Sequence, residues 1–224
     1  MCGRFTLTSP GELVAEAFGI DEPPQLTPRY NIAPTQPVAV VRGAGPGGAR
    51  SLSFLRWGLV PTWAKGPRGR SLIINARAES LTEKPSFREP FESRRCLVPA
   101  DGFYEWKEVP GARAKQPFLL RMADGRPFAF AGLWERPHPG DAESPGTCLV
   151  LTTEPNALVR EIHDRMPLIL APQDYAAWLD PDVGGARRLS SLLRPFPAEA
   201  MTAVRVGLAV NNANNDTPDC LQPA

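Results

Sequence analysis

The chain of 224 residues is 42% hydrophobic and 22% charged, as in an ordinary globular protein, and its 26 prolines predict many rigid, extended connections. It contains no apolar run near the ~18 residues of a membrane span, and its start lacks the basic stretch and apolar core of a signal peptide. Composition therefore argues against a membrane protein, and we expect a cytoplasmic one. The net charge of +1 by itself indicates no partner.

Charge is distributed unevenly along the chain. Residues 1–127 carry a net charge of +6, and residues 128–224 carry −5. The stretch between Pro23 and Ala78 has no acidic residue, and its basic residues are Arg29, Arg42, Arg50, Arg56, Lys65, Arg68, Arg70 and Arg77. A segment of one sign suits a polyanion, but it is equally compatible with a solvated loop face that acids elsewhere neutralise.

The predicted elements are short strands separated by turns, with few helices. Ser9 and Glu12 form a capping box around Pro10, which predicts a helix that ends at Gly19. Further strands are predicted over 38–41, 52–55, 71–74, 97–106, 118–122, 128–134, 147–151 and 204–210, and further helices over 157–162 and 173–179. Residues 183–200 are expected to be irregular. We therefore expect an α+β fold, with one domain over 1–224, a mixed, mainly antiparallel, barrel-like β core and peripheral helices.

The four cysteines lie too far apart in sequence for a Cys-x-x-Cys metal or redox pair. Cys96 and Cys148 stand in apolar runs and are predicted to be small buried hydrophobes. The chain has two histidines, and one of them, His138, lies in a proline-rich loop that we expect at the surface. The sequence therefore does not predict a structural zinc site.

Cys2 directly follows Met1, so removal of Met1 would leave a cysteine whose thiol and α-amine share one residue. An amine condenses with an aldehyde to an imine, and the neighbouring thiol can close on the imine carbon to give a five-membered thiazolidine. The α-amine titrates at about 7.7–8.0 and a thiol at about 8.5, so we expect both to react near neutrality without a large pKa shift. The alternative is that Cys2 is an incidental residue of a frayed terminus.

Two titratable residues interrupt apolar patterns. Glu105 stands between Tyr104 and Trp106 in a predicted strand, where an apolar setting would raise the carboxyl pKa and suit it to general acid–base catalysis. The alternative is an outward-facing residue of an alternating strand. His163 follows a predicted helix, where it could shuttle protons at a cleft, although a lone histidine is more often structural.

Further candidates lie in or near the acid-free stretch. Asn75 follows an apolar strand, where its amide could orient a substrate or satisfy a loop, and Arg77 could hold a phosphate bidentately. Trp63 and Trp106 have flat faces that could stack on bases. Tryptophans in a domain of this size are more often core residues, as we expect for Trp57.

Several motifs occur together along the chain, in order. They are MCGRF at the start, RYNIAPTQ at 29–36, RWGLVPTWAK at 56–65, NARAESLTEKPSFR at 75–88, RCLVPADGFYEWK at 95–107, AGLWE at 131–135 and IHDRMPLIL at 162–170. With these motifs the chain closely resembles the SOS-response-associated peptidase family, the abasic-site processing proteins with an SRAP domain. The loop near 136–146 and the segment 181–200 carry no such motif.

The resemblance implies an SRAP domain that binds single-stranded DNA and traps abasic sites. Cys2 matches the N-terminal nucleophile of the family, and Asn75, Glu105 and His163 match its active-site asparagine, glutamate and histidine. Arg4 and Arg77 match positions that the family uses near the DNA backbone. With Trp63 and Trp106 they form the expected DNA-binding set.

The expected reaction joins these residues. The amine of Cys2 attacks the ring-opened aldehyde of an abasic site, and its thiol then closes a thiazolidine cross-link. Glu105 moves protons during both steps, and His163 assists sugar ring opening and cross-link release. Asn75 holds the N-terminus in register with the substrate. This chemistry requires no metal, nucleotide or organic cofactor.

Two other classes of function stay open. The first is a cysteine peptidase or N-terminal-nucleophile amidohydrolase, in which Cys2 attacks a carbonyl with His163 as base. The second is a reader of single-stranded or modified DNA without chemistry. Strand cleavage by an abasic-site lyase step and self-cleavage near Cys2 are side activities compatible with the same residues. We expect a monomer that associates with the nucleoid on DNA, with replication proteins as further candidate partners.

Overall fold

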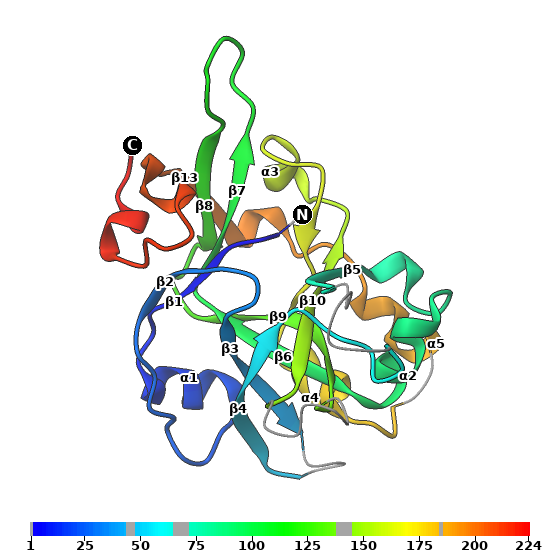
Figure 1. Cartoon of the computed structure of the whole chain (residues 1–224). Helices are drawn as coiled ribbons and strands as arrows, with labels where there is room; N and C mark the ends of the chain where they lie inside the picture. Colours follow the sequence, from blue (N-terminus) through cyan, green and yellow to red (C-terminus); the bar gives the residue numbers. More distant parts are fainter. Residues whose placement is uncertain (1, 44–47, 65–71, 138–144, 184–185) are drawn as a thin grey trace.

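The computed structural model describes residues 2–43, 48–64, 72–137, 145–183 and 186–224. Two β-sheets form its centre and short helices lie around them, which confirms the predicted α+β class (Figure 1). Among the described helices, none has the length and apolar character needed to cross a membrane.

Thirteen strands and five α-helices are described. The strands are β1 (Phe5–Leu7), β2 (Arg29–Ile32), β3 (Pro37–Gly43), β4 (Arg50–Trp57), β5 (Asn75–Arg77), β6 (Arg95–Ala100), β7 (Gly102–Lys107), β8 (Gln116–Met122), β9 (Phe128–Glu135), β10 (Thr147–Thr153), β11 (Met166–Pro167), β12 (Ile169–Leu170) and β13 (Met201–Arg205). The helices are α1 (Gly11–Phe18), α2 (Pro85–Ser93), α3 (Ala157–Arg160), α4 (Tyr175–Leu179) and α5 (Ala186–Leu189).

The larger sheet is ring-like. Its pairings run β10-β4-β3-β6-β9 and return from β9 to β10, with β11, β12 and β5 at the margins. The ring is incompletely closed because two of its seams are short: β3 and β6 share one residue pair, and β4 and β10 share two. β10 runs parallel to β4 and to β5, whereas the other neighbours in the ring are antiparallel. The sheet is therefore mixed and mainly antiparallel, as predicted.

The smaller sheet has the order β13-β8-β7-β1-β2 and is antiparallel throughout. Its N-terminal strand β1 inserts Phe5 into the aromatic centre of the ring, where the Phe5 ring lies 5.2 Å from Trp57 and 5.5 Å from Phe130, centroid to centroid. All three side chains are at least 99% buried. Edge-to-face aromatic contacts of this kind stabilise a core beyond the burial of their area, so the first residues of the chain are held at the junction of the two sheets.

The strand predicted over 97–106 is two strands in different sheets. The chain leaves the ring after β6, bends at Asp101 and enters the smaller sheet as β7. Gly102 makes this crossing possible, because a Cβ there would lie 2.9 Å from the Leu120 carbonyl oxygen. Glu105 therefore belongs to a different sheet from the apolar run that precedes it.

Asp101 also replaces the predicted capping box. Ser9 donates its hydroxyl to Asp101 at 2.6 Å and its amide to the same carboxylate at 2.8 Å, so it does not cap α1, whose N-cap residue is Pro10. The helix itself forms and ends at Gly19 in the left-handed conformation, as predicted. A distant carboxylate therefore accepts from the Ser9 amide, which the side chain of Glu12 would have accepted from in a capping box.

Further elements differ from the sequence-based expectations. In place of the strand predicted over 71–74, the structure has β5, which begins directly after it at Asn75. The strand predicted over 204–210 is β13, which ends at Arg205 before a 3₁₀ turn over Leu208–Asn211. Helix α2 was not predicted, and the segment 183–200 contains α5 and two 3₁₀ turns. Lys65, Arg68, Arg70 and His138 lie outside the described residues.

Candidate active site

Pairing of β1 with β7 brings Cys2 beside Glu105. Phe5 lies opposite Phe103, and the Tyr104 amide donates to the Arg4 carbonyl at 3.0 Å, so the residues before β1 continue alongside β7. Cys2 is fully buried, and its Sγ lies 3.9 Å from the Arg4 carbonyl oxygen. The N-terminal residues are therefore packed into the core, which contradicts the alternative of a frayed end.

Asn75 holds the Cys2 backbone from the ring sheet. Its strand β5 pairs in parallel with β10 in that sheet, and Asn75 Nδ2 donates to the Cys2 carbonyl oxygen at 2.7 Å. Asn75 Oδ1 is buried without a hydrogen-bond partner in the described part of the chain, so it can accept from a group that enters the site. Residues two apart on a strand share a face, so the exposed Arg77 lies on the same face as Asn75.

Glu105 and His163 face each other across the site. Glu105 is 2% exposed, and its Oε2 lies 3.7 Å from His163 Nε2, which is too long for a direct hydrogen bond. The other ring nitrogen, His163 Nδ1, lies 3.0 Å from the Arg165 amide, 3.1 Å from the Arg165 carbonyl oxygen and 3.1 Å from Asp164 Oδ1. These partners include one donor and two acceptors, so both neutral tautomers of the ring fit the contacts of Nδ1. Glu105 Oε1 is buried and has no partner among the described groups.

Burial sets the protonation states of these groups. Desolvation raises the pKa of Glu105 to about 7, opposed by the positive N-terminus and reinforced by Asp164. Desolvation, together with the same terminal charge, lowers the pKa of His163 below its usual range. Burial also raises the pKa of the Cys2 thiol well above its ordinary value, and the nearby Glu105 adds to this effect. Nothing in the sequence predicts a shifted thiol pKa at Cys2, because no local pattern reveals its complete burial.

Arg165 fixes the position of the His163 loop and was missed in the sequence-based reasoning. Its guanidinium forms a two-pronged ion pair with Glu79, each N–O distance 2.9 Å, and donates to the Thr152 carbonyl at 2.9 Å. A bidentate pair of this type restricts orientation as well as contributing energy. The signal in the sequence was the basic residue two positions after His163, inside the same motif.

Arg4 and Trp106 form the rim beside Cys2 and Glu105. Arg4 Nη1 donates to the Val210 carbonyl at 2.8 Å and to Asn31 Oδ1 at 3.1 Å, and its guanidinium lies 6.0 Å from the Trp106 ring centroid. Trp106 donates its indole N–H to Asn211 Oδ1 at 2.7 Å. Both side chains are therefore oriented by residues 206–224, which we call the C-terminal segment. The DNA contacts expected of them remain predictions.

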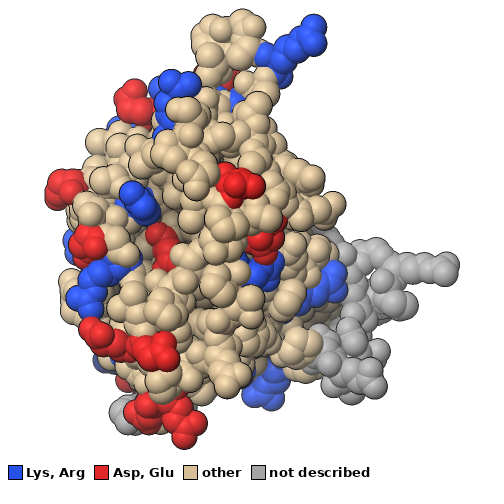
Figure 2. All heavy atoms as spheres, turned by 90° about the vertical axis from the view of Figure 1, so that its left-hand side faces the viewer, with Lys and Arg blue, Asp and Glu red and all other residues tan. Residues whose placement is uncertain are grey.

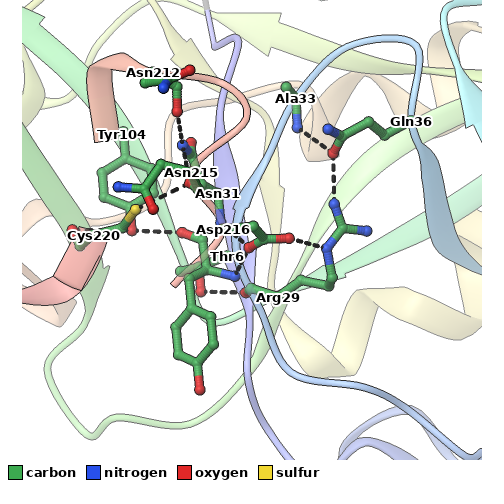
Figure 3. A network of polar contacts seen from close by, with 11 residues as sticks. Thr6, Arg29, Asn31, Ala33, Gln36, Tyr104, Asn212, Asn215, Asp216 and Cys220 are labelled. Atoms are coloured by element: carbon green, nitrogen blue, oxygen red, sulfur yellow. Dashed lines mark hydrogen bonds and ion pairs between the residues drawn. The ribbon is translucent and has the colours of Figure 1, made fainter. Parts of the chain in front are cut away.

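A polar network locks this C-terminal segment onto β2 (Figure 3). The fully buried Asn31 donates its side-chain amide to the carbonyls of Val210, Asn212 and Asn215 at 2.8–3.2 Å. The Asp216 carboxylate accepts from the backbone amide of Asn31 at 2.8 Å and forms an ion pair with the Arg29 guanidinium. The sequence gives no sign of these pairings, because their partners lie about 180 residues apart.

Of the predicted site residues, Cys2, Asn75, Glu105 and His163 lie together, with Arg4 and Trp106 at the rim and Arg77 on the adjoining face. Trp63 is 67% exposed on a turn, and in the described part of the chain no hydrogen bond or ring contact joins it to this group. Cys96 and Cys148 are fully buried and free, as predicted, and Cys220 is buried as well.

Comparison with known proteins agrees with this arrangement. The chain is 42% identical over 225 residues to "Abasic site processing protein YoqW" of Bacillus subtilis strain 168, across 99% of each chain. It is 31% identical to YedK of Escherichia coli K12, across the full length of both, and 30% identical to HMCES of Pongo abelii, across 76% of that protein. Both relatives carry the same description, abasic site processing protein.

The fold is likewise shared with a solved structure. A crystal structure of a protein from Bacteroides thetaiotaomicron superposes with a TM-score of 0.86 at 28% identity, across 100% of both chains. A sequence profile of the SOS response associated peptidase (SRAP) family matches residues 1–213. The chain therefore belongs to the SRAP family.

Proposed function

We propose that this protein processes abasic sites in DNA by binding single strands and trapping the lesion covalently through Cys2. The observation that carries the proposal is the placement of Cys2: Asn75 holds its carbonyl at 2.7 Å, and it lies beside a buried carboxyl, Glu105, that faces His163. The names of the relatives, abasic site processing proteins, supply the substrate class.

The reaction begins once removal of Met1 has freed the Cys2 amine. The neutral amine attacks the aldehyde carbon of the ring-opened abasic sugar and forms a carbinolamine, which takes up one proton and loses water to give a protonated imine. Glu105, whose pKa of about 7 keeps part of its population protonated at neutral pH, donates the proton that leaves with this water. Its carboxylate then takes the proton of the thiol as sulfur bonds to the imine carbon. The product is a thiazolidine, and one water is released overall.

The raised pKa of the Cys2 thiol supports this order of steps. A buried thiol that stays protonated is a weak nucleophile, so the amine reacts first and the thiol reacts only when a base lies beside it. His163, 3.7 Å from Glu105, acts at the sugar by assisting ring opening, and by reversal it assists release of the cross-link. Asn75 keeps the Cys2 backbone in place, and its unpartnered Oδ1 accepts from the amine or the sugar.

The raised pKa of the Cys2 thiol also weighs against a cysteine peptidase. Peptidase nucleophiles have lowered thiol pKa values, because the thiolate is the reactive form. Here burial raises the pKa of the Cys2 thiol, and its Sγ lies near the Arg4 carbonyl. Lyase cleavage and self-cleavage near Cys2 remain proposals for side activities of the same imine and thiol.

The test compares variants of Cys2 with an abasic single-stranded oligonucleotide. Wild type should give a heat-stable adduct that needs no reductant. Cys2→Ala and Cys2→Ser keep the amine, so each should give at most a labile imine that borohydride traps. A heat-stable adduct with Cys2→Ala would exclude the thiazolidine. Blocking the aldehyde with methoxyamine should abolish the adduct, whereas peptide hydrolysis would continue, and full function in Cys2→Ala would favour a DNA reader without chemistry.

A further inference from the structure

Beyond the site, β7 and β8 continue as a hairpin that projects from the body of the molecule (Figure 1). Its loop, residues 108–115, is exposed throughout, and we call it the hairpin arm. The last strand pair below the arm joins Lys107 to Gln116. Gln116 donates to the Val206 carbonyl at 2.9 Å and accepts from Arg205 at 3.1 Å, so the base of the arm is fixed to the C-terminal segment.

The tip of the arm is a defined turn. The Ala112 amide donates to the Val109 carbonyl at 3.1 Å, and the two central residues are Pro110 and Gly111. Gly111 has a φ of 79°, the positive value that the third residue of a type II turn requires, and proline is favoured at the position before it. The hydrogen-bonded turn and the fixed base hold the arm away from the core, although the side chains of the arm do not pack into that core.

The arm and its base are basic. Residues 107–115 contain three basic residues and one acidic residue. The basic residues are Lys107, Arg113 and Lys115, and the acidic residue, Glu108, forms an ion pair with Lys115 at 2.7 Å. Arg113 has no hydrogen bond or ion pair in the described part of the chain. Figure 2 shows Lys and Arg side chains extending into solvent at the top of the molecule, where the hairpin projects. The charge of Lys115 also reaches the site, because it contributes to lowering the pKa of His163.

We propose that the hairpin arm binds the phosphates of the single strand that flanks the abasic site, through Arg113 and Lys115. This inference rests on the proposed function. The arm is the outer part of the same strand that carries Glu105 and Trp106, so a DNA strand that leaves the site along β7 meets it directly. Gly111 is the sixth residue after Glu105, so an extended chain between them spans about 20 Å. The arm therefore contacts DNA beyond the lesion and leaves the reacting sugar to the core residues.

The experiment measures binding of Arg113→Ala/Lys115→Ala to abasic oligonucleotides of about 4 and about 16 nucleotides, the ends of the usual range of single-strand site sizes. The long oligonucleotide should bind about 2-fold to 30-fold more weakly, the range for two lost exposed ion pairs. The slope of log K against log salt should flatten by about 1.4, or about 0.7 per phosphate. The short oligonucleotide should keep its affinity and its cross-linking rate.

The matched control is Arg121→Ala/Arg126→Ala, which removes two exposed positive charges far from the arm, one near the end of β8 and one in the loop that follows it, and should leave both affinities and the salt slope unchanged. If the control lost as much affinity for the long oligonucleotide as the arm variant, the loss would follow from net charge and not from the arm, and the proposal would be overturned. Equal affinity of the arm variant and wild type for the long oligonucleotide would overturn it too, as would an equal loss on both lengths. Absence of any wild-type adduct would instead contradict the proposed function, so the two failures are distinguishable.

Discussion

Replacement of Glu105 by glutamine is expected to stabilise the fold while it slows cross-linking. Burial raises the pKa of this carboxyl from an ordinary 4.5 to about 7, and a displacement of that size corresponds to about 3 kcal/mol. Between these two pH values the folded protein holds a proton that the unfolded chain has released, so stability falls as pH rises through this window. Above pH 7 the wild type carries the whole cost of a buried carboxylate.

Glutamine has nearly the same shape but cannot ionise, so the variant avoids that cost. At pH 8 we expect Glu105→Gln to be more stable than wild type by up to about 3 kcal/mol, or roughly 6–12 °C in Tm for a chain of this length. At pH 5 the folded wild type holds Glu105 protonated, so neither protein buries a charge there. The difference in stability should then shrink to about 1 kcal/mol. Denaturant titrations at the two pH values measure both quantities.

Glu154→Gln serves as the control, because Glu154 is an exposed carboxylate and its loss should change stability little at either pH. In the same preparations, adduct formation by Glu105→Gln should slow by about 10²-fold to 10⁴-fold, even with a simple open-chain aldehyde. If Glu105→Gln were no more stable than wild type at pH 8, the reasoning from burial to a raised pKa would be refuted. Undiminished cross-linking would refute its role in proton transfer.

Three further predictions concern single residues. His163→Ala should slow adduct formation chiefly with the natural cyclic sugar, and equal impairment on an open-chain aldehyde would contradict its assignment to ring opening. Arg77→Ala should weaken binding to all single-stranded sequences and flatten the salt slope by about 0.7, whereas affinity independent of salt would contradict a phosphate contact. Asp216→Ala should destabilise the protein by about 2 kcal/mol, because it leaves the backbone amides of Tyr30 and Asn31 and the Nε of Arg29 without their acceptor. Hydrogen exchange should then quicken over residues 206–224, and unchanged protection there would show that the network does not hold this segment.

The sequence predicted the fold class and, through the family motifs, the four residues of the candidate site. The setting of Glu105 between two aromatics indicated burial, and the structure buries it. The strand period also placed it correctly on a strand. These features are local, since they depend on neighbours in the sequence.

Other features depend on long-range pairing, which no local pattern reports. The strand predicted over 97–106 divides between two sheets, because the chain turns at Asp101 to reach β1. Asp101 then accepts from the Ser9 amide and hydroxyl, so Ser9 does not form the predicted capping box. Arg4 was predicted to contact DNA, and in the structure its guanidinium donates a hydrogen bond to the Val210 carbonyl, 206 residues away. The distances that decide these outcomes exist only in the folded chain.

The measurement that tests the central claim most directly is the intact mass of the protein after incubation with an abasic single-stranded oligonucleotide. The account predicts a heat-stable species whose mass is that of the chain without Met1 plus the oligonucleotide, less one water, with the modification on Cys2. Borohydride should add no hydrogen to it, because a thiazolidine has no imine left to reduce. Free protein alone, an adduct on another residue, or an adduct that survives heating only after reduction would contradict it.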